Sequence, residues 1–393
     1  MLKNILNFSE LGGDYLSLNK SLEVNNKVSV FKMSFSERIL SSLNLPGKVL
    51  YVTADMISAK KAYDEFYKII GDKAVLFSPG TDLLSYKEMF SPDNNINRMV
   101  VLSKILDGGV DVVVASIDSL IYLTSKKEDF ISNIINIKID KELDKDKTIQ
   151  KLLMLGYKRE ELVQEPGTFA VRGGILDIFP INSTNPYRIE LFDYLVESIK
   201  SFDPIKQATL EIVKSIKICS NSNICIEDVD SLIKKINAVK YEFVSKDEEV
   251  RHLAIVESIQ EKLKRNQFSY SLDILFPFIK EDLGSIFDYL ENKFIIVLDE
   301  SKIVYDSMQK FYDGIEERKK LLKGYSGYFP TKASGYLSKA ELIEKIKACR
   351  CVAHQKITSA NRFFNPTKVF SFRSAPIIRY VNNKEEFAKD IFS

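Results

Sequence analysis

Two adjacent carboxylates, Asp299 and Glu300, follow an apolar run from Phe294 to Leu298. Because a buried strand that ends in acidic residues can hold Mg²⁺ against the phosphates of a nucleotide, this pattern indicates a magnesium site at a strand's carboxyl end. Such a site needs a second component. Backbone N–H groups of a glycine-rich loop, together with a lysine, must hold the phosphates. The sequence would have to supply that loop after an earlier strand.

The loop in the corresponding place lacks these features. It follows the first expected strand and reads FKMSFSE from Phe31 to Glu37, without glycine and without the Lys-Ser or Lys-Thr pair of a phosphate-binding loop. We expect Met33 and Phe35 to crowd an approaching phosphate. We therefore predict no cofactor and no metal for this chain. Asp299 and Glu300 are interpreted as a vestigial Walker B element that now caps the following helix.

Strands and helices alternate around this loop. Ser34 with Glu37 fits a capping box, Asp55 is placed to cap a helix, and Gly71 stands where that helix should end. Such alternation is typical of a parallel sheet covered by helices. The expected strands are Val28–Phe31, Val49–Thr53, Ala74–Phe77 and Val112–Ala115, and the expected helices start at Phe35 and run from Met56 to Ile70.

A β-rich pattern runs from Gly156 to Asp203. Gly173-Gly174 predicts a turn that needs permissive backbone, and a polar connection follows Pro180. A helix from Thr148 to Leu155, closed by Gly156, precedes this stretch after a charged linker. The expected strands are Phe169–Arg172, Ile175–Phe179 and Tyr187–Phe192, and the expected core is Leu152, Leu153, Phe169, Ile175, Ile178, Ile189 and Leu191.

The last of these strands has one apolar face and one mixed face. Side chains alternate across a strand, so Arg188, Glu190 and Phe192 lie together, opposite Ile189 and Leu191. Arginine combined with a large aromatic side chain is typical of a protein-binding patch, since both are over-represented among interface hot spots. In the alternative, structural interpretation, Phe192 covers the sheet edge against a helix and Arg188 pairs with a nearby acid. Spacing alone leaves both interpretations open.

The same stretch resembles a known family. The bacterial excision-repair protein UvrB and the transcription-repair coupling factor share a segment to which this chain is similar, through GYxRxxxVxxxGxFAVRGGILDIFP, PYRIELF and ESIxxFDP. The resemblance implies a small domain that binds the repair protein UvrA. Position by position, the family's UvrA contacts fall on Arg172, Arg188 and Phe192. After Phe192 this chain has DYLVESI where the family has GDEIESI, so the turn is expected to differ in shape.

The resemblance covers the chain from about residue 20 onward and implies an α/β architecture. We expect a degenerate helicase-like (P-loop NTPase-like) parallel-sheet domain whose first part is residues 1–125 and whose second part is residues 215–365. An α+β UvrA-binding domain is inserted at residues 126–214, and residues 366–393 are a linker or the start of a next domain. In the second part we expect helices at Leu253–Lys264, Ser285–Leu290 and Ser301–Lys323, and another that begins at Ser338.

A further family pattern lies between the third and fourth expected strands. Asp82, Ser85-Tyr86, Ser91-Pro92 and Arg98 match it, although Ser85 replaces the usual proline. We expect these residues to fix a long surface loop and its return to the sheet. No catalytic residue is predicted there.

Composition argues against several classes of protein. The net charge is +2, and residues 156–203 hold five basic against eight acidic side chains. A dedicated duplex binder would show a clustered basic face. The four cysteines match no common zinc spacing, and only two histidines accompany them. Neither a secretory signal nor an apolar run of about 18 residues is present, so we expect a cytoplasmic protein without a membrane partner.

Two functions remain open. In the first, the chain is the N-terminal module of a coupling factor and recruits UvrA where RNA polymerase is stalled at DNA lesions. The full-length parent would use ATP and Mg²⁺ to translocate on DNA and so displace RNA polymerase. It would do this through domains absent here, and those domains of the same chain are also expected partners of this module. In the second, the chain is a UvrB-type ATP-dependent damage-loading protein. The glycine-free loop and the lack of a tyrosine-rich hairpin between residues 80 and 110 favour the first.

Overall fold

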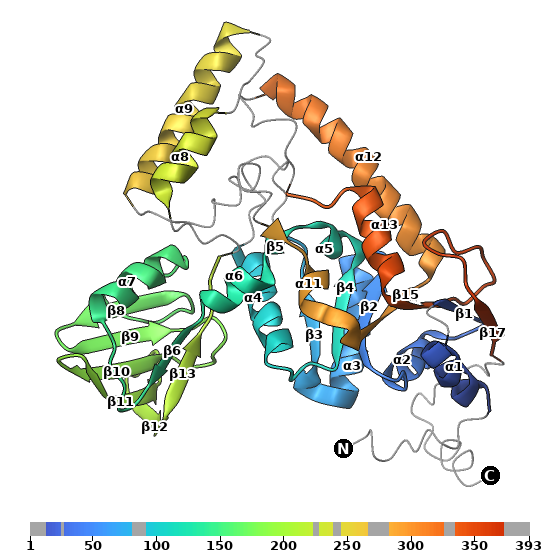
Figure 1. The fold of residues 1–393 in the computed structure, drawn as a ribbon, viewed down its shortest axis with the longest axis horizontal. Helices are drawn as coiled ribbons and strands as arrows, with labels where there is room; N and C mark the ends of the chain where they lie inside the picture. Colours follow the sequence, from blue (N-terminus) through green and yellow to red (C-terminus); the bar gives the residue numbers. More distant parts are fainter. Residues whose placement is uncertain are drawn as a thin grey trace, which may run out of the picture.

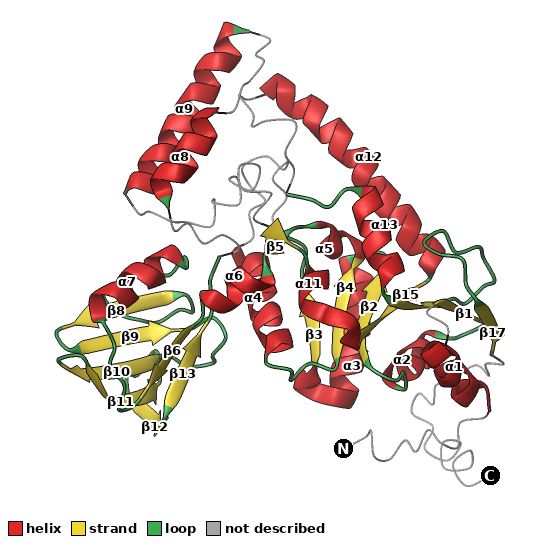
Figure 2. Cartoon of the chain, viewed as in Figure 1, coloured by secondary structure: helices red, strands yellow, loops and turns green. Residues whose placement is uncertain are grey.

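A parallel sheet and a smaller, mainly antiparallel sheet dominate the chain (Figures 1 and 2). The computed structural model describes residues 13–24, 27–80, 92–222, 228–238, 245–265, 283–325 and 335–372. The smaller sheet and helix α7 lie together at one end of the molecule, and helices α8 (Val229–Ala238) and α9 (Lys246–Lys264) form a pair apart from both sheets (Figure 1). Among the described helices, none combines the length and apolar character needed to span a membrane.

The larger sheet has seven strands in the order β17-β1-β16-β15-β2-β4-β3. Every pairing in it is parallel, which confirms the expected parallel sheet. All its strands therefore end at one edge. The strands are β1 (Lys27–Phe31), β2 (Lys48–Thr53), β3 (Ala74–Phe77), β4 (Val112–Ser116), β15 (Phe294–Asp299), β16 (Arg350–His354) and β17 (Lys368–Ser371).

Helices cover both faces of this sheet, and each layer has its own apolar core. Leu22 of α1, Ile39 of α2 and Phe66 of α3 pack with one set of alternate strand residues, and Met99 of α4 and Leu342 of α13 pack with the other set. The first layer is α1 (Gly13–Val24), α2 (Phe35–Leu43) and α3 (Met56–Ile70). The second is α4 (Pro92–Leu106), α5 (Ile117–Ile121), α11 (Ile286–Leu290), α12 (Ser301–Tyr325) and α13 (Lys339–Ala348).

The predicted helix boundaries of the first layer are confirmed. The Glu37 carboxylate accepts a hydrogen bond of 2.6 Å from the Ser34 backbone N–H, and the Ser34 hydroxyl accepts one from the Glu37 N–H. Asp55 accepts a bond of 2.7 Å from the Ser58 N–H. Gly71 ends α3 with a φ of +61°, which a side chain would strain. A second capping box, between Ser338 and Glu341, begins α13 as expected.

The smaller sheet has six strands in the order β12-β11-β10-β9-β8-β7. A separate strand pair, β6 with β13, and the helix α7 close its inner face over one apolar core. The three strands expected from the sequence are β8, β9 and β10. The elements are β6 (Ile135–Lys138), α7 (Lys145–Met154), β7 (Lys158–Arg159), β8 (Thr168–Arg172), β9 (Ile175–Phe179), β10 (Tyr187–Phe192), β11 (Leu195–Phe202), β12 (Thr209–Ile212) and β13 (Ser215–Ile218).

Short elements connect these two parts. Helix α6 (Lys127–Ser132) precedes β6, and β5 (Thr124–Ser125) pairs with β14 (Leu283–Gly284) on either side of the inserted residues. Lys217 of β13 forms an ion pair with Asp107 after α4.

Within the larger part, the 3₁₀ turns η3 (Gly71–Lys73) and η6 (Glu291–Lys293) lead into β3 and β15.

Two sequence expectations for the smaller part were wrong. Helix α7 begins at Lys145 and not at Thr148, because Asp144 in the charged linker caps it by accepting a bond of 3.0 Å from the Lys147 N–H. Ile175 is half-buried and lies outside the apolar core, where Leu176 takes the place expected for it with no exposed surface. Alternation along β9 explains this, since Leu176 and not Ile175 shares a face with the buried Ile178. Leu152, Phe169, Ile178 and Ile189 are buried as expected, and Leu153 and Leu191 pack partly buried against them.

Three boundaries also differ from the expected ones. Strand β13 pairs with β6 and so continues the smaller part past residue 214. Helix α9 begins at Lys246, before the expected Leu253. Strand β17 lies beyond residue 365 and pairs in parallel with β1, so the larger sheet continues into the region expected to be a linker or the start of a next domain. The rest of that region, from residue 373, lies outside the described residues.

Candidate protein-binding site

The three predicted UvrA contacts lie on one face of the smaller sheet. Arg172 ends β8, Arg188 and Phe192 belong to β10, and β9 runs between these strands. The register pairs Ala170 with Asp177 and Asp177 with Arg188. Because alternate residues of a strand share a face, Arg172 lies on the side of Ala170, and Phe192 on the side of Arg188. The fold thus brings the three candidates together; their role stays a prediction.

Asp177 joins the two arginines. Its Oδ1 accepts a hydrogen bond of 2.8 Å from Nε of Arg188, and its Oδ2 accepts bonds of 2.8 Å from Nη2 of Arg188 and 2.9 Å from Nη2 of Arg172. The carboxylate is 1% exposed. Charge-assisted bidentate pairs of this kind fix the direction of a guanidinium. Asp177 was not predicted from the sequence, although an acid inside the apolar run ILDIF is a visible signal.

Arg188 is further held by its neighbours. Its guanidinium lies over the ring of Phe202, with 4.7 Å to the ring centroid, and its Nη2 donates to Oε1 of Gln207 at 3.3 Å. The hydrogen bond to Asp177 raises the pKa of Arg188 above its already high usual value. Pairing of Arg188 with a nearby acid, which the structural interpretation required, is therefore observed.

Phe192 behaves differently. It is 70% exposed, so it does not pack against a helix as the structural interpretation required. Asp193 and Tyr194 make the two-residue turn from β10 to β11, and Asp193 has a φ of +56°. Tyr194 and Leu195 are also exposed. The tip of this hairpin is therefore an apolar projection beside the arginines.

The glycine turn between β8 and β9 lies against the same part of β10. Gly174 O accepts a hydrogen bond of 2.8 Å from the Leu191 N–H. A Cβ atom on Gly174 would lie 2.7 Å from the Leu191 carbonyl oxygen. Gly174 therefore lets the turn approach the strand that carries Phe192 closely.

Another ion pair completes this face. Lys200 of β11 donates to both carboxylate oxygens of Glu190 at 2.7 Å, and the Ser198 hydroxyl donates to the same carboxylate at 2.6 Å. These bonds lower the pKa of Glu190 below its usual value, with Lys200 the largest cause. Glu190 and Lys200 thus neutralise each other beside Arg188.

The carboxylates Asp299 and Glu300 lie at the end of β15, beside the start of α2. Arg38 Nε is 2.6 Å from Oδ1 of Asp299, and Arg38 Nη1 is 2.8 Å from Oε1 of Glu300. Glu300 also accepts a bond of 3.0 Å from the Lys356 N–H. The two carboxylates therefore bind an arginine. Glu300 also stands directly before α12, where its carbonyl oxygen accepts a bond of 3.1 Å from the Val304 N–H; capping of this helix by the two side chains stays a prediction. Arg38 was not singled out from the sequence.

The loop before α2 was expected to exclude a phosphate through Met33 and Phe35, and the structure shows a different arrangement. Met33 has no exposed surface and packs in the apolar core, so it does not crowd the loop from outside. The Glu37 carboxylate binds the Ser34 N–H instead, at the helix start where a phosphate would bind. Phe35 is half-buried beneath Lys61, whose Nζ lies 4.7 Å from the ring centroid. An acid therefore binds the backbone N–H at the start of α2, and the next residue, Arg38, pairs with Asp299 and Glu300.

Burial sets the charges around this cluster. The pKa of Asp299 is raised by burial, although Arg38 opposes the shift. His354, at the end of β16, has no exposed surface, and burial lowers its pKa to about 3, with the charge of Arg38 adding to the shift. Its Nε2 lies 3.3 Å from the Ser41 hydroxyl. The histidine is therefore neutral beside the ion pair.

Arg98 is held by backbone carbonyl oxygens, and the loop that it was expected to fix lies outside the described residues. It is completely buried, and its guanidinium donates to the carbonyl oxygens of Ser78, Ser119 and Tyr122, each at 3.0 Å. The ring of Phe77 lies 4.3 Å from the guanidinium carbon. Asp82, Ser85, Tyr86 and Ser91 of the same pattern lie outside the described residues.

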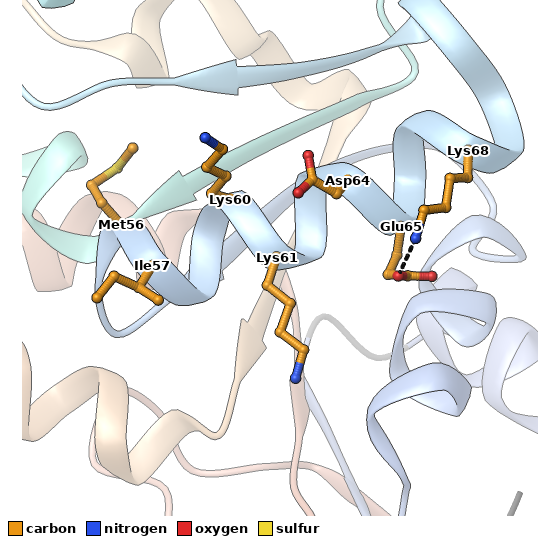
Figure 3. Close-up of a pocket in the computed structure, with 7 residues that line it drawn as sticks. All are labelled: Met56, Ile57, Lys60, Lys61, Asp64, Glu65 and Lys68. Carbon is orange, nitrogen blue, oxygen red and sulfur yellow. Dashed lines mark hydrogen bonds and ion pairs between the residues drawn. The ribbon is translucent and has the colours of Figure 1, made fainter. Parts of the chain in front are cut away.

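A shallow hollow of about 560 Å³ lies on α3 (Figure 3), and its lining residue Lys61 also contacts the ring of Phe35 at the start of α2. Its described lining residues all belong to this one helix, so none of the other described elements forms a wall. Lys68 pairs with Glu65 at 2.8 Å. The lining residues are Met56, Ile57, Lys60, Lys61, Asp64, Glu65 and Lys68. Within the described part of the chain, no group of three or more histidine, cysteine or acidic side chains is arranged to hold a metal ion.

The part of the chain that contains the smaller sheet matches a known protein family. Residues 135–223 match the family described as the UvrB interaction domain. This range contains β6 to β13, and with them Arg172, Arg188 and Phe192. The transcription-repair-coupling factor of Bacillus subtilis is 27% identical over 320 residues, which are 78% of this chain and 27% of the relative. The chain is therefore similar to the transcription-repair-coupling factors and resembles their UvrB-like N-terminal region.

Other coupling factors match in the same way. That of Staphylococcus epidermidis is 25% identical over 312 residues, which are 76% of this chain and 26% of the relative. That of Staphylococcus aureus strain MSSA476 is 28% identical over 261 residues, or 64% of this chain and 22% of the relative. The chain thus spans about a quarter of the length of the curated coupling factors that it matches.

Proposed function

We propose that this chain recruits the excision-repair protein UvrA through Arg172, Arg188 and Phe192. The observation that carries the proposal is their arrangement on one face of the matched domain. Two directed guanidinium groups lie beside a phenylalanine that is 70% exposed. Arginine and aromatic side chains are the usual anchors of protein interfaces. In a coupling factor, this recruitment would take place in the cytoplasm where RNA polymerase is stalled at a DNA lesion.

The parallel-sheet part is proposed to be a helicase-like platform that has lost nucleotide binding. Residues 1–125 and 215–365, with β17 added at the edge, would form this platform, and residues 126–214 with β13 would be the inserted UvrA-binding domain. The ion pairs of Arg38 with Asp299 and Glu300 support the loss of ATP, because they use the carboxylates that would otherwise hold Mg²⁺. On this proposal the chain itself needs no cofactor.

The rest of a full-length parent would supply the remaining activities. These are ATP- and Mg²⁺-dependent translocation on DNA and displacement of RNA polymerase, with UvrA, RNA polymerase, DNA and the other domains of the same chain as partners. The alternative is a UvrB-type ATP-dependent loading protein. It would require a phosphate site at the start of α2, where Glu37 and Arg38 now lie. We therefore prefer the recruitment function.

Calorimetry of the folded chain with UvrA tests the proposal. We expect saturable binding that Phe192→Ala weakens. Ile57→Ala on α3 is a matched control, because Ile57 is also an exposed apolar residue, with 85% of its surface accessible, but lies outside the sheet. Equal affinities of the wild type and the Phe192 variant, both folded, would overturn the assignment of this face.

A further inference from the structure

Asp177 is a buried acid at the centre of the proposed UvrA-binding face. It lies in the middle of β9, with Ala170 opposite it on β8 and Arg188 opposite it on β10. All three hydrogen bonds described for its carboxylate come from arginines that reach outward. An acid so well buried is stable only with such partners. Asp177 and the two arginines therefore form one unit.

Some N–H groups of Arg172 and Arg188 are not used within this unit and can donate hydrogen bonds to a partner. Arg188 uses Nε and Nη2 within the protein, and no described residue accepts a hydrogen bond from its Nη1. Arg172 uses Nη2, and no described residue accepts a bond from its Nε or Nη1. The Arg172 side chain is 51% exposed, compared with 22% for Arg188. The free N–H groups suit carboxylate oxygens, and the exposed Phe192 suits an apolar pocket beside them.

We propose that Asp177 is the positioning residue of the UvrA-binding face, which holds Arg172 and Arg188 in the conformation that meets acidic side chains of UvrA. The inference rests on the function proposed above. Long arginine side chains lose conformational freedom when they bind a partner, and side chains already fixed lose less. Asp177 fixes two of them at once. Through its own negative charge, it also leaves the three groups with one net positive charge.

The contrary possibility is that Asp177 only stabilises the domain. An acid with that role alone would affect UvrA binding by changing the amount of folded protein. A positioning residue affects the affinity of the folded protein, and its effect depends on the two arginines. The two roles are therefore separated by comparing the loss of UvrA affinity that a substitution of Asp177 causes in the presence and in the absence of the two arginines.

The first experiment is calorimetry of the 393-residue chain with UvrA. Asp177→Asn keeps the shape of the side chain and removes its charge; we expect roughly tenfold weaker binding of the folded variant, because the arginines are no longer fixed. Glu211→Gln is the matched control, since Glu211 is an exposed acid on β12 of the same sheet. In a chain that already carries Arg172→Ala and Arg188→Ala, Asp177→Asn should have no further effect on affinity.

A second measurement needs no UvrA. In nitrogen-15 NMR spectra, the Nε–Hε signal of Arg188 should be resolved and slow to exchange with water, because Nε donates to Asp177 at 2.8 Å. Arg188→Lys removes this signal and so identifies it. In Asp177→Asn we expect the signal to exchange faster while the thermal unfolding transition remains. If that variant does not fold, Arg188→Lys supplies the test, since lysine keeps the charge and loses the two-pronged pairing.

The outcomes are separable. Wild-type affinity of folded Asp177→Asn, with weakened binding of Arg188→Ala, would overturn the inference and leave the proposed function in place. An equal loss of affinity with and without the arginines, an unchanged Arg188 signal, or wild-type affinity of Arg188→Lys would also overturn it. If the wild-type chain does not bind UvrA, both proposals fail.

Discussion

The guanidinium of Arg38 lies 2.6 Å from a carboxylate oxygen of Asp299, at the edge where the strands of the parallel sheet end. Both side chains are only 9% exposed. In α/β proteins this edge is the usual place for a ligand, and a strand that ends in acids usually meets magnesium there. In this protein an arginine from α2 supplies the positive charge. The pair therefore joins the start of α2 to the end of β15.

Removal of Arg38 should destabilise the protein. Arg38→Met leaves the Asp299 carboxylate buried without its partner, and such a loss typically lowers the free energy of unfolding by about 3 to 5 kcal/mol. Urea denaturation measures the change. Lys68→Met is the control, because its pair with Glu65 is exposed to solvent and should contribute little to stability. Adding Asp299→Asn should restore part of the loss, and an Arg38→Met variant as stable as wild type would contradict the prediction.

ATP should not bind to this chain. On the helicase-like platform proposed above, the phosphates would bind at the start of α2, where the Glu37 carboxylate and the Arg38 guanidinium lie, so a nucleotide would meet an acid there. Equilibrium dialysis or calorimetry with ATP and Mg²⁺ checks this, with a phosphate-loop ATPase as the positive control. Saturable binding at micromolar ATP would show that the loop from Phe31 to Glu37 opens to accept phosphates.

Acid should weaken the fold through His354. Its pKa is about 3 in the folded protein and 6.5 in its usual state, so below pH 6.5 the unfolded chain takes up a proton that the folded chain does not. This contribution to stability is complete above pH 6.5 and is lost as the pH falls toward 3, at about 1.4 kcal/mol per pH unit at most. We expect His354→Gln to show a shallower decline in the free energy of unfolding between pH 6.5 and 5. The same acid slope in both proteins would contradict this.

The sequence predicted elements whose signals are local. The capping box of Ser34 with Glu37 and the cap at Asp55 involve residues within one helical turn, so the chain around them suffices to define the helix start. The start of α7 was predicted too late because several acids stand in the charged linker, and only the folded backbone shows that Asp144 is the cap. Strand β17 was not predicted, because it is only four residues long and its partner β1 lies near the other end of the chain.

The sequence also indicated which face carries the candidate contacts, but not how they are held. Alternation placed Arg188 and Phe192 together, because period two is a property of a single strand. The link from Arg188 to Asp177 depends on which residues of β9 and β10 pair, and periodicity does not fix that register. Arg38 and Glu300 are separated by 262 residues, and only the parallel order of β1, β16 and β15 brings them together.

The inner face of β10 should matter for folding. Ile189 has no exposed surface and packs in the core beneath the smaller sheet. Ile189→Ala creates a cavity and should lower the free energy of unfolding by roughly 2 to 5 kcal/mol. Leu191→Ala should cost less, because Leu191 is only partly buried. Thermal melts of both variants measure the difference. A small effect of Ile189→Ala would mean that the core relaxes to fill the space.

The outer face should separate binding from folding, and Phe192 and Arg188 should do so differently. Phe192→Ala removes an exposed side chain and should change stability by less than about 0.5 kcal/mol while weakening the UvrA complex by about 1 to 4 kcal/mol. Arg188→Ala should weaken the complex similarly, but it also leaves the buried Asp177 with Arg172 alone, so its melting temperature should fall as well. Calorimetry with UvrA and thermal melts of the same samples give both quantities. The prediction fails for Phe192 if its variant melts far below wild type, and for Arg188 if its variant melts like wild type, because the pair with Asp177 would then contribute nothing to the fold.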